Sequence, residues 1–168
     1  LYSDNGVFSK DRFNYGTRVL LSSIDINKLR GNVLDLGCGI GVVSIILGTC
    51  NKNINIDMVD VNERAIELAK DNLKLCNIKA NIFISNVYSE VKNKYDYIIT
   101  NPPIRAGKDT VRKFLIGSYD YLKEQGKLYF VMRKDHGVKS MIKEMSSLFE
   151  VNIINKDKGF YVVLATER

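Results

Sequence analysis

Strand-like and helix-like segments alternate along most of this chain, and a glycine-rich turn joins the first strand to the helix that follows it. Residues Asn32–Leu36 (NVLDL) are short and apolar, which is typical of a buried strand. The sequence DLGCGIG then occupies positions 35–41. Glycines allow a tight turn and the close approach of a ligand, and the start of a helix presents free N–H groups. The pattern therefore predicts an α/β fold with a ligand-binding turn at the edge of its sheet.

Six more strands and four helices are expected beyond the first strand. The strands are Ile54–Val59, Asn81–Ile84, Tyr95–Thr100, Lys127–Met132, Phe149–Ile154 and Phe160–Ala165. The helices are Gly41–Cys50, a segment capped by Asn62 that runs to Cys76, Lys108–Lys123 and Val138–Leu148. Alternating strands and helices predict a parallel sheet with helices on both faces.

The last two strands are joined differently from the others. Only residues 155–159 lie between them, too few for a crossover helix, so the pair should form an antiparallel hairpin. The predicted fold class is a doubly wound, mostly parallel, seven-stranded α/β sheet with a C-terminal antiparallel hairpin. Residues 1–168 are expected to form a single domain, since 168 residues fit one globular unit.

The composition excludes several classes of protein. With 45% hydrophobic and 26% charged residues the chain is globular, and no apolar run reaches the roughly 18 residues of a membrane span. It has no apparent signal peptide, three cysteines without a C-x-x-C pair and one histidine, so we expect a cytoplasmic protein with neither disulfides nor a metal centre. The first residue is Leu1 rather than methionine, which is consistent with an N-terminus truncated upstream.

Positive charge is concentrated in one part of the sequence. Ten basic and four acidic residues lie between Asn101 and Lys143, and this excess of six equals the net charge of +6. The cluster has two interpretations: a solvated lysine-rich face, or a surface for a polyanion such as RNA.

The glycine turn carries an acid, Asp35, two residues before its first glycine. A carboxylate there would repel a pyrophosphate and suits the ammonium of an amino-acid moiety, which favours S-adenosylmethionine over NAD as the ligand. A second acid, Asp60, ends the second strand, where its carboxylate can accept hydrogen bonds from ribose hydroxyls. Asp60 would serve either cofactor.

Both prolines of the chain lie in Asn101-Pro102-Pro103-Ile104, directly after the fourth strand. Proline fixes φ and removes a backbone N–H, so two in succession make a stiff corner that presents oxygens. The Asn101 side chain and the Pro102 carbonyl can hold an NH₂ group by its two hydrogens. The first and fourth strands of a doubly wound sheet are neighbours, so this corner should face the glycine turn across one crevice.

These residues resemble motifs I, II and IV of the class I S-adenosylmethionine-dependent methyltransferases, which have a Rossmann-like fold. Four further segments are similar to the small-subunit ribosomal RNA guanine-N2 methyltransferase family: NGVFS at 5–9, GTRVLL at 16–21, SNVYS at 85–89 and KGFY at 158–161. The resemblance implies that Phe8 and Ser9 lie near the methionine end of the cofactor and Asn86 near its adenine. It also implies that Asn101, Pro102 and Pro103 hold the target amino group.

The predicted site has three sets of residues. The residues expected to bind the cofactor are Phe8, Ser9, Asp35, Gly37, Cys38, Gly39, Gly41, Asp60, Val61, Asn86, Val87 and Asn101. The catalytic residues are Asn101, Pro102 and Pro103. The residues expected to bind the substrate are Ile104, Arg105, Lys108 and Arg112.

The expected function is methyl transfer from S-adenosylmethionine to an amino nitrogen, guanine N2 of ribosomal RNA above all. The expected partner is ribosomal RNA or the small ribosomal subunit, and the sequence makes no prediction about oligomeric state. Three alternatives remain open. Methyltransferases of adenine N6 or protein glutamine also use Asn-Pro-Pro corners, usually followed by tyrosine. A non-catalytic RNA-binding module is the second alternative, and an NAD oxidoreductase, which has no use for the corner, is the third.

Overall fold

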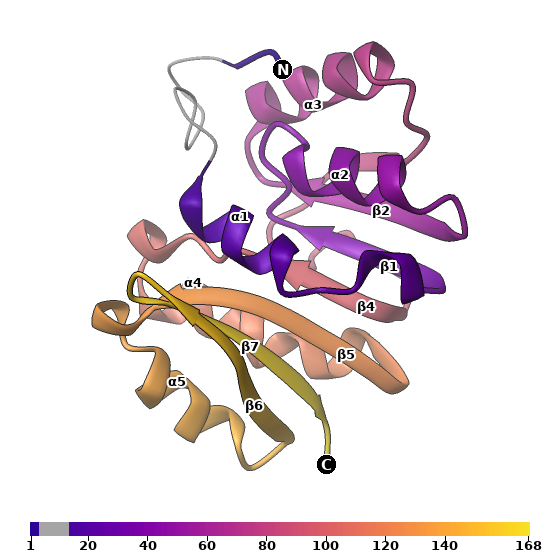
Figure 1. Cartoon of the computed structure of the whole chain (residues 1–168). Helices are drawn as coiled ribbons and strands as arrows, with labels where there is room; N and C mark the ends of the chain where they lie inside the picture. Colours follow the sequence, from indigo (N-terminus) through magenta and orange to yellow (C-terminus); the bar gives the residue numbers. More distant parts are fainter. Residues whose placement is uncertain (4–13) are drawn as a thin grey trace.

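One seven-stranded sheet organises the computed structural model, which describes residues 1–3 and 14–168 (Figure 1). The strand order is β3-β2-β1-β4-β5-β7-β6. The strands are β1 (Gly31–Leu36), β2 (Ile54–Asp60), β3 (Asn81–Ile84), β4 (Tyr95–Thr100), β5 (Leu122–Arg133), β6 (Phe149–Asp157) and β7 (Phe160–Glu167). All pairings from β3 to β5 are parallel, and β7 is antiparallel to both of its neighbours. The predicted fold class is confirmed.

Helices cover both faces of this sheet (Figure 1). On one face lie α1 (Tyr15–Ser22), α2 (Val42–Cys50) and α3 (Glu63–Leu75), and on the other lie α4 (Lys108–Leu115) and α5 (Val138–Met145). Side chains alternate along each strand, so Val33 enters the core with the first three helices and Leu34 enters the other core. Short 3₁₀ turns are η1 (Ile26–Lys28), η2 (Ile104–Ala106), η3 (Gly117–Tyr121) and η4 (Lys134–His136).

The carboxyl ends of β1 and β4 lie side by side in the middle of the sheet. From this point the chain winds outward in one direction through β2 and β3 and in the other through β5, which makes it the switch point where open α/β sheets bind ligands. Thr100 donates a hydrogen bond from Oγ1 to the Leu36 carbonyl at 2.8 Å and so joins the two strand ends. The predicted neighbourhood of the first and fourth strands is correct.

The helix predicted for Lys108–Lys123 is too long. In the structure α4 ends at Leu115, η3 follows, and β5 already begins at Leu122. The ring of Tyr88 packs against Gly117, where an added Cβ would lie 3.3 Å from it, and Tyr88 stacks on Tyr121. Gly117 and its packing against Tyr88 therefore end the helix earlier than the periodicity of the sequence predicts.

Other boundaries also differ from the prediction. β5 starts five residues before Lys127. The strand continues through Gly126 because Gln125 adopts φ +68° and the register with β4 shifts at this point. The Val138–Leu148 helix stops at Met145. No element is predicted before Asn32, yet α1 and η1 precede it.

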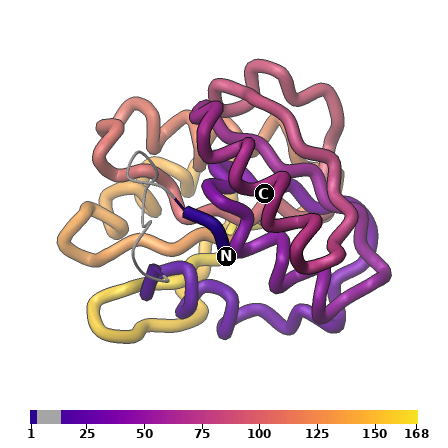
Figure 2. The backbone as a smooth tube through the Cα atoms, turned by 90° about the horizontal axis from the view of Figure 1, so that it is seen from above, coloured from indigo at the N-terminus to yellow at the C-terminus, as the bar shows by residue number. Residues whose placement is uncertain are grey.

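The β6–β7 hairpin is confirmed, but its turn is shorter than the five residues predicted. Asp157 pairs with Phe160, and the two residues between them, Lys158 and Gly159, both have positive φ, the conformation of a type I′ turn. Viewed from above, the tip of this hairpin lies beside the start of α1 (Figure 2). The Tyr15 hydroxyl donates to Asp157 Oδ2 at 2.6 Å.

Candidate active site

Three glycines shape the turn between β1 and α2. Gly37, Gly39 and Gly41 have φ values of +70°, +54° and +98°, a region that other residues enter at a cost. A Cβ on Gly39 would meet no atom of the described residues within 4 Å, so the turn leaves open space above it. The Cys38 backbone N–H donates to the Val59 carbonyl at 2.8 Å and fastens the turn to β2. The geometry leaves main chain accessible at the predicted cofactor position.

Asp60 at the end of β2 supports the same turn. Its Oδ2 accepts the Gly39 N–H at 2.8 Å, and its Oδ1 accepts the Asn62 N–H at 2.9 Å. A carboxylate oxygen has two lone pairs, so each oxygen keeps one acceptor position after these bonds. The carboxylate is only partly buried, so the two positions fit the paired hydroxyls of a ribose.

Exposed apolar side chains flank Asp60. Val61 is 63% exposed, and Ile84, which pairs with Asp60 in the β2–β3 register, is 44% exposed. The loop after Ile84 contains Asn86, exposed, and Val87, which has φ +53°. Apolar and amide side chains of this kind suit a flat heterocyclic ring such as adenine, which has an apolar face and a polar edge. Sequence reasoning missed Ile84, whose signal was an apolar residue at the carboxyl end of a strand.

Asp35 lies beneath the glycine turn and is only 2% exposed. Ser44 of α2 donates to its Oδ2 at 2.6 Å. Burial raises the pKa of this carboxyl to about 7, against the lowering effect of the Ser44 hydrogen bond. Burial also raises the pKa of the Cys38 thiol, which therefore stays neutral.

The Asn-Pro-Pro corner leaves β4 next to the glycine turn. The Asn101 side-chain NH₂ donates to Asn14 Oδ1 at 3.3 Å and to Thr17 Oγ1 at 3.2 Å. Pro102 is buried, and Pro103 immediately precedes η2. Asn14 and Thr17 were not among the predicted site residues, although asparagine is a typical helix N-cap.

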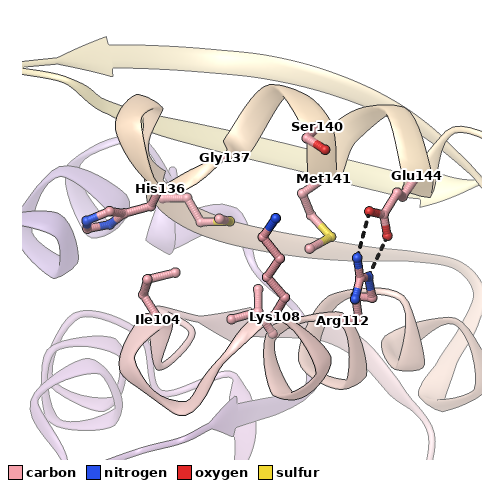
Figure 3. A pocket seen from close by; sticks show the side chains of 10 residues that line it. Ile104, Lys108, Arg112, His136, Gly137, Ser140, Met141 and Glu144 are labelled. Atoms are coloured by element: carbon pink, nitrogen blue, oxygen red, sulfur yellow. Dashed lines mark hydrogen bonds and ion pairs between the residues drawn. The ribbon is translucent and has the colours of Figure 1, made fainter.

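Beyond the corner lies a small cavity of about 70 Å³ between the η2–α4 segment and the η4–α5 segment (Figure 3). Ile104 and Lys108 line one side, and His136 and Met141 line the other. The cavity opens next to the residue that follows the two prolines, so it adjoins the predicted substrate position.

The predicted substrate residue Arg112 is already ion-paired. Its guanidinium donates from Nε to Glu144 Oε2 at 2.8 Å and from Nη1 to Asp109 Oδ1 at 3.0 Å. Glu144 thereby raises the pKa of Arg112. The pair connects α4 to α5, so Arg112 helps to hold the wall of the cavity together.

The basic cluster of the sequence is divided in space. β5 has 12 residues and therefore spans about 40 Å at about 3.3 Å per residue. Lys123, near its start, is ion-paired with Asp96 at 3.0 Å, at the amino edge of the sheet. Arg105 and Lys108 follow β4 and lie at the carboxyl edge, where the candidate site is. Only part of the cluster can therefore contact a substrate at this site.

Two of the residues predicted to bind the cofactor, Phe8 and Ser9, lie outside the described residues. Within residues 1–3 and 14–168, no three histidine, cysteine or acidic side chains gather as a metal site would require. Within the same ranges, no helix combines the length and apolar character needed to cross a bilayer.

Comparison with known proteins identifies the relatives of this chain. The model of the methyltransferase small domain family matches residues 1–164. The chain is 40% identical to the uncharacterized protein YbxB of Bacillus subtilis, over 97% of its own length and 83% of that protein. It is 44% identical to ribosomal RNA small subunit methyltransferase C of Aliivibrio fischeri over 62% of its length, and this match spans 30% of that relative.

A solved structure has the same fold. The T. thermophilus 16S rRNA N2 methyltransferase (RsmC), in complex with AdoMet and guanosine, superposes with a TM-score of 0.86 at 22% identity, over 97% of this chain and 46% of that one. The fold, the glycine turn and the family match together define a class I S-adenosylmethionine-dependent methyltransferase. The chain belongs to the methyltransferase small domain family. The predicted resemblance and cofactor are confirmed.

Proposed function

We propose that residues 1–168 act as one catalytic domain that methylates guanine N2 in small-subunit ribosomal RNA. The observation that carries the proposal is the Asn101–Pro103 corner, which opens beside the glycine turn at the β1–β4 switch point. The similarity to methyltransferase C relatives, and to a structure of an N2 methyltransferase with guanosine, supports the choice of nucleotide.

The residues of the crevice divide the work between cofactor and substrate. Asp60 would accept the ribose hydroxyls, and the glycine turn would let the amino-acid end of S-adenosylmethionine approach the main chain. The bound cofactor supplies an electrophilic sulfonium methyl group. Asn101 Oδ1 and the Pro102 carbonyl would accept the two hydrogens of the target NH₂ group and aim its lone pair at that methyl.

The reaction needs no general base among these residues. The new N–CH₃ bond forms as the S–CH₃ bond breaks, and the methylated nitrogen, now acidic, loses a proton to water. The contribution of the protein is therefore positioning, which can lower a barrier by several kcal/mol without proton transfer to a side chain. Ile104 would give the base an apolar contact at the mouth of the neighbouring cavity.

Tritiated methyl transfer to small-subunit rRNA and to small ribosomal subunits, followed by nucleoside digestion, tests the proposal. The expected product is N2-methylguanosine. Asn101→Ala should lower kcat/KM by about 10²–10³ while S-adenosylmethionine affinity stays within a few-fold of wild type. Asn152→Ala, at an exposed β6 position, serves as the matched control. N6-methyladenosine, a methylated glutamine, or full activity of Asn101→Ala would contradict the proposal.

A further inference from the structure

The first turn of α1 holds the side chain of Asn101. Asn14 caps this helix: its Oδ1 accepts the Thr17 backbone N–H at 3.2 Å and also the Asn101 NH₂ at 3.3 Å. Thr17 Oγ1 accepts the same NH₂ group at 3.2 Å. Two acceptors on one helical turn therefore hold the amide nitrogen of a residue 84 and 87 positions further along the chain.

These bonds fix which end of the Asn101 amide faces the helix. Asn14 Oδ1 is an acceptor because a backbone N–H donates to it, so the atom of Asn101 that contacts it must be the NH₂ nitrogen. Turning the amide over would set the Asn101 oxygen against Asn14 Oδ1, and the bond between these two side chains would be lost. The Asn101 oxygen is therefore directed away from α1.

The same oxygen retains its capacity to accept a hydrogen bond. Among the described residues no group donates to Asn101 Oδ1, yet no buried side-chain oxygen or nitrogen of these residues lacks a partner. Asn101 is only partly buried, so its oxygen keeps some accessible surface. It is available as an acceptor.

The first turn of α1, which holds Asn101, is itself fixed by packing on both of its sides. Leu20 and Val19 of α1 are buried in the core against the sheet. At the other side of the helix start, Phe160 lies so close that a Cβ on Gly16 would be 2.9 Å from its ring. Main-chain freedom at Asn101 is limited too, since Pro102 follows it and restricts its backbone. The remaining freedom is rotation of the side chain, which Asn14 and Thr17 limit.

We propose that Asn14 and Thr17 are positioning residues that orient Asn101 so that its Oδ1 accepts a hydrogen of the substrate amino group. The proposal rests on the role of Asn101 in the function proposed above. In this proposal the N-terminus of α1 contributes to catalysis through Asn101, without itself contacting the cofactor or the substrate. It also explains why an asparagine is suited to the corner: its NH₂ engages the helix while its oxygen engages the substrate.

Four substitutions separate positioning from helix stability. Thr17→Val removes the hydroxyl with almost no change of shape, and Thr17→Ser retains it. Asn14→Gly removes the acceptor but keeps a residue that helix N-caps tolerate, and Asn14→Asp keeps both the cap and the acceptor. Ser22→Ala is the matched control, because Ser22 lies on the same helix and its hydroxyl donates to the Val19 carbonyl instead.

The measurements are kcat and KM for methyl transfer to small-subunit rRNA, the Kd for S-adenosylmethionine and the thermal midpoint. Thr17→Val and Asn14→Gly should each lower kcat by about 2- to 10-fold, the equivalent of one neutral hydrogen bond, with Kd and thermal midpoint near wild type. Thr17→Ser, Asn14→Asp and Ser22→Ala should keep wild-type kcat. In an Asn101→Ala background, Thr17→Val should have no further effect.

The outcomes distinguish this inference from the proposed function. If Asn101→Ala is as active as wild type, the function proposed for the corner is wrong. If Asn101→Ala shows its expected loss of activity but Thr17→Val and Asn14→Gly both turn over at the wild-type rate, the positioning role alone is overturned. It is also overturned if Thr17→Val lowers kcat equally in the Asn101→Ala background, or if activity falls only in proportion to the thermal midpoint.

Discussion

The buried carboxyl of Asp35 should make the stability of the cofactor-free protein depend on pH. Its pKa is raised to about 7 by burial, from an ordinary value of 3.8. The folded protein then binds this proton more tightly than the unfolded chain does, so the contribution is complete below about pH 4 and is lost as the pH rises through about 7. The difference corresponds to about 4 kcal/mol, since one pH unit equals about 1.4 kcal/mol.

The assay is urea unfolding of wild type and Asp35→Asn at a series of pH values from 4.5 to 8. An asparagine resembles the protonated acid and can still accept from Ser44, which donates to Asp35 Oδ2 in the native protein. The free energy of unfolding of wild type relative to Asp35→Asn should therefore fall as the pH rises, by about 3 kcal/mol between pH 4.5 and pH 8. A constant cost of the extra N–H group cancels in this comparison.

Asp96 provides a control of opposite sign. Burial raises the pKa of Asp96, but hydrogen bonds from the Asn32 N–H and Lys123 outweigh it, and the net effect lowers the pKa. Asp96→Asn should cost stability throughout pH 4.5–8. This cost should disappear only as the pH falls below the ordinary value of 3.8, so the series for this variant extends below pH 4. Parallel curves for wild type and Asp35→Asn between pH 4.5 and 8 would refute the reasoning about Asp35.

Three other predictions concern the site. Asp60→Asn should weaken S-adenosylmethionine binding about 10- to 150-fold by calorimetry, with Asp96→Asn, at the opposite edge, unchanged; equal affinities of the two variants would contradict the ribose role. Gly39→Ala should cost only about 1–2 kcal/mol of stability, because residue 39 has a φ of +54°. It should nevertheless weaken S-adenosylmethionine binding more than tenfold, and an unaltered Kd would show that the cofactor does not bind over the turn. Lys108→Gln should reduce the slope of log affinity for RNA against log salt by about 0.7–0.9, whereas the ion-paired Arg112→Gln should mainly lower the thermal midpoint; the same loss of slope in both would refute the distinction.

Local patterns in the sequence determined most of the architecture and the residues proposed to bind the cofactor. Alternating apolar strands and amphipathic helices predict a parallel sheet, because a strand that returns in parallel needs a crossover. The connection after β6 was too short for one, so the hairpin was predictable. Gly37, Gly39 and Gly41 could be recognised because positive φ is a property of single residues.

Only the tertiary structure decided which of these side chains are buried, ion-paired or hydrogen-bonded, and which residues are their partners. The tertiary structure places β7 between β5 and β6 and pairs Arg112 with Glu144. It also buries Asp35, which raises the pKa of that carboxyl to about 7. It also brought Thr17 to Asn101 across 84 positions of sequence. Hydrogen bonds, ion pairs and desolvation act over a few ångströms of space, and distance in space between residues far apart in sequence is set by the packing of the whole sheet and its helices.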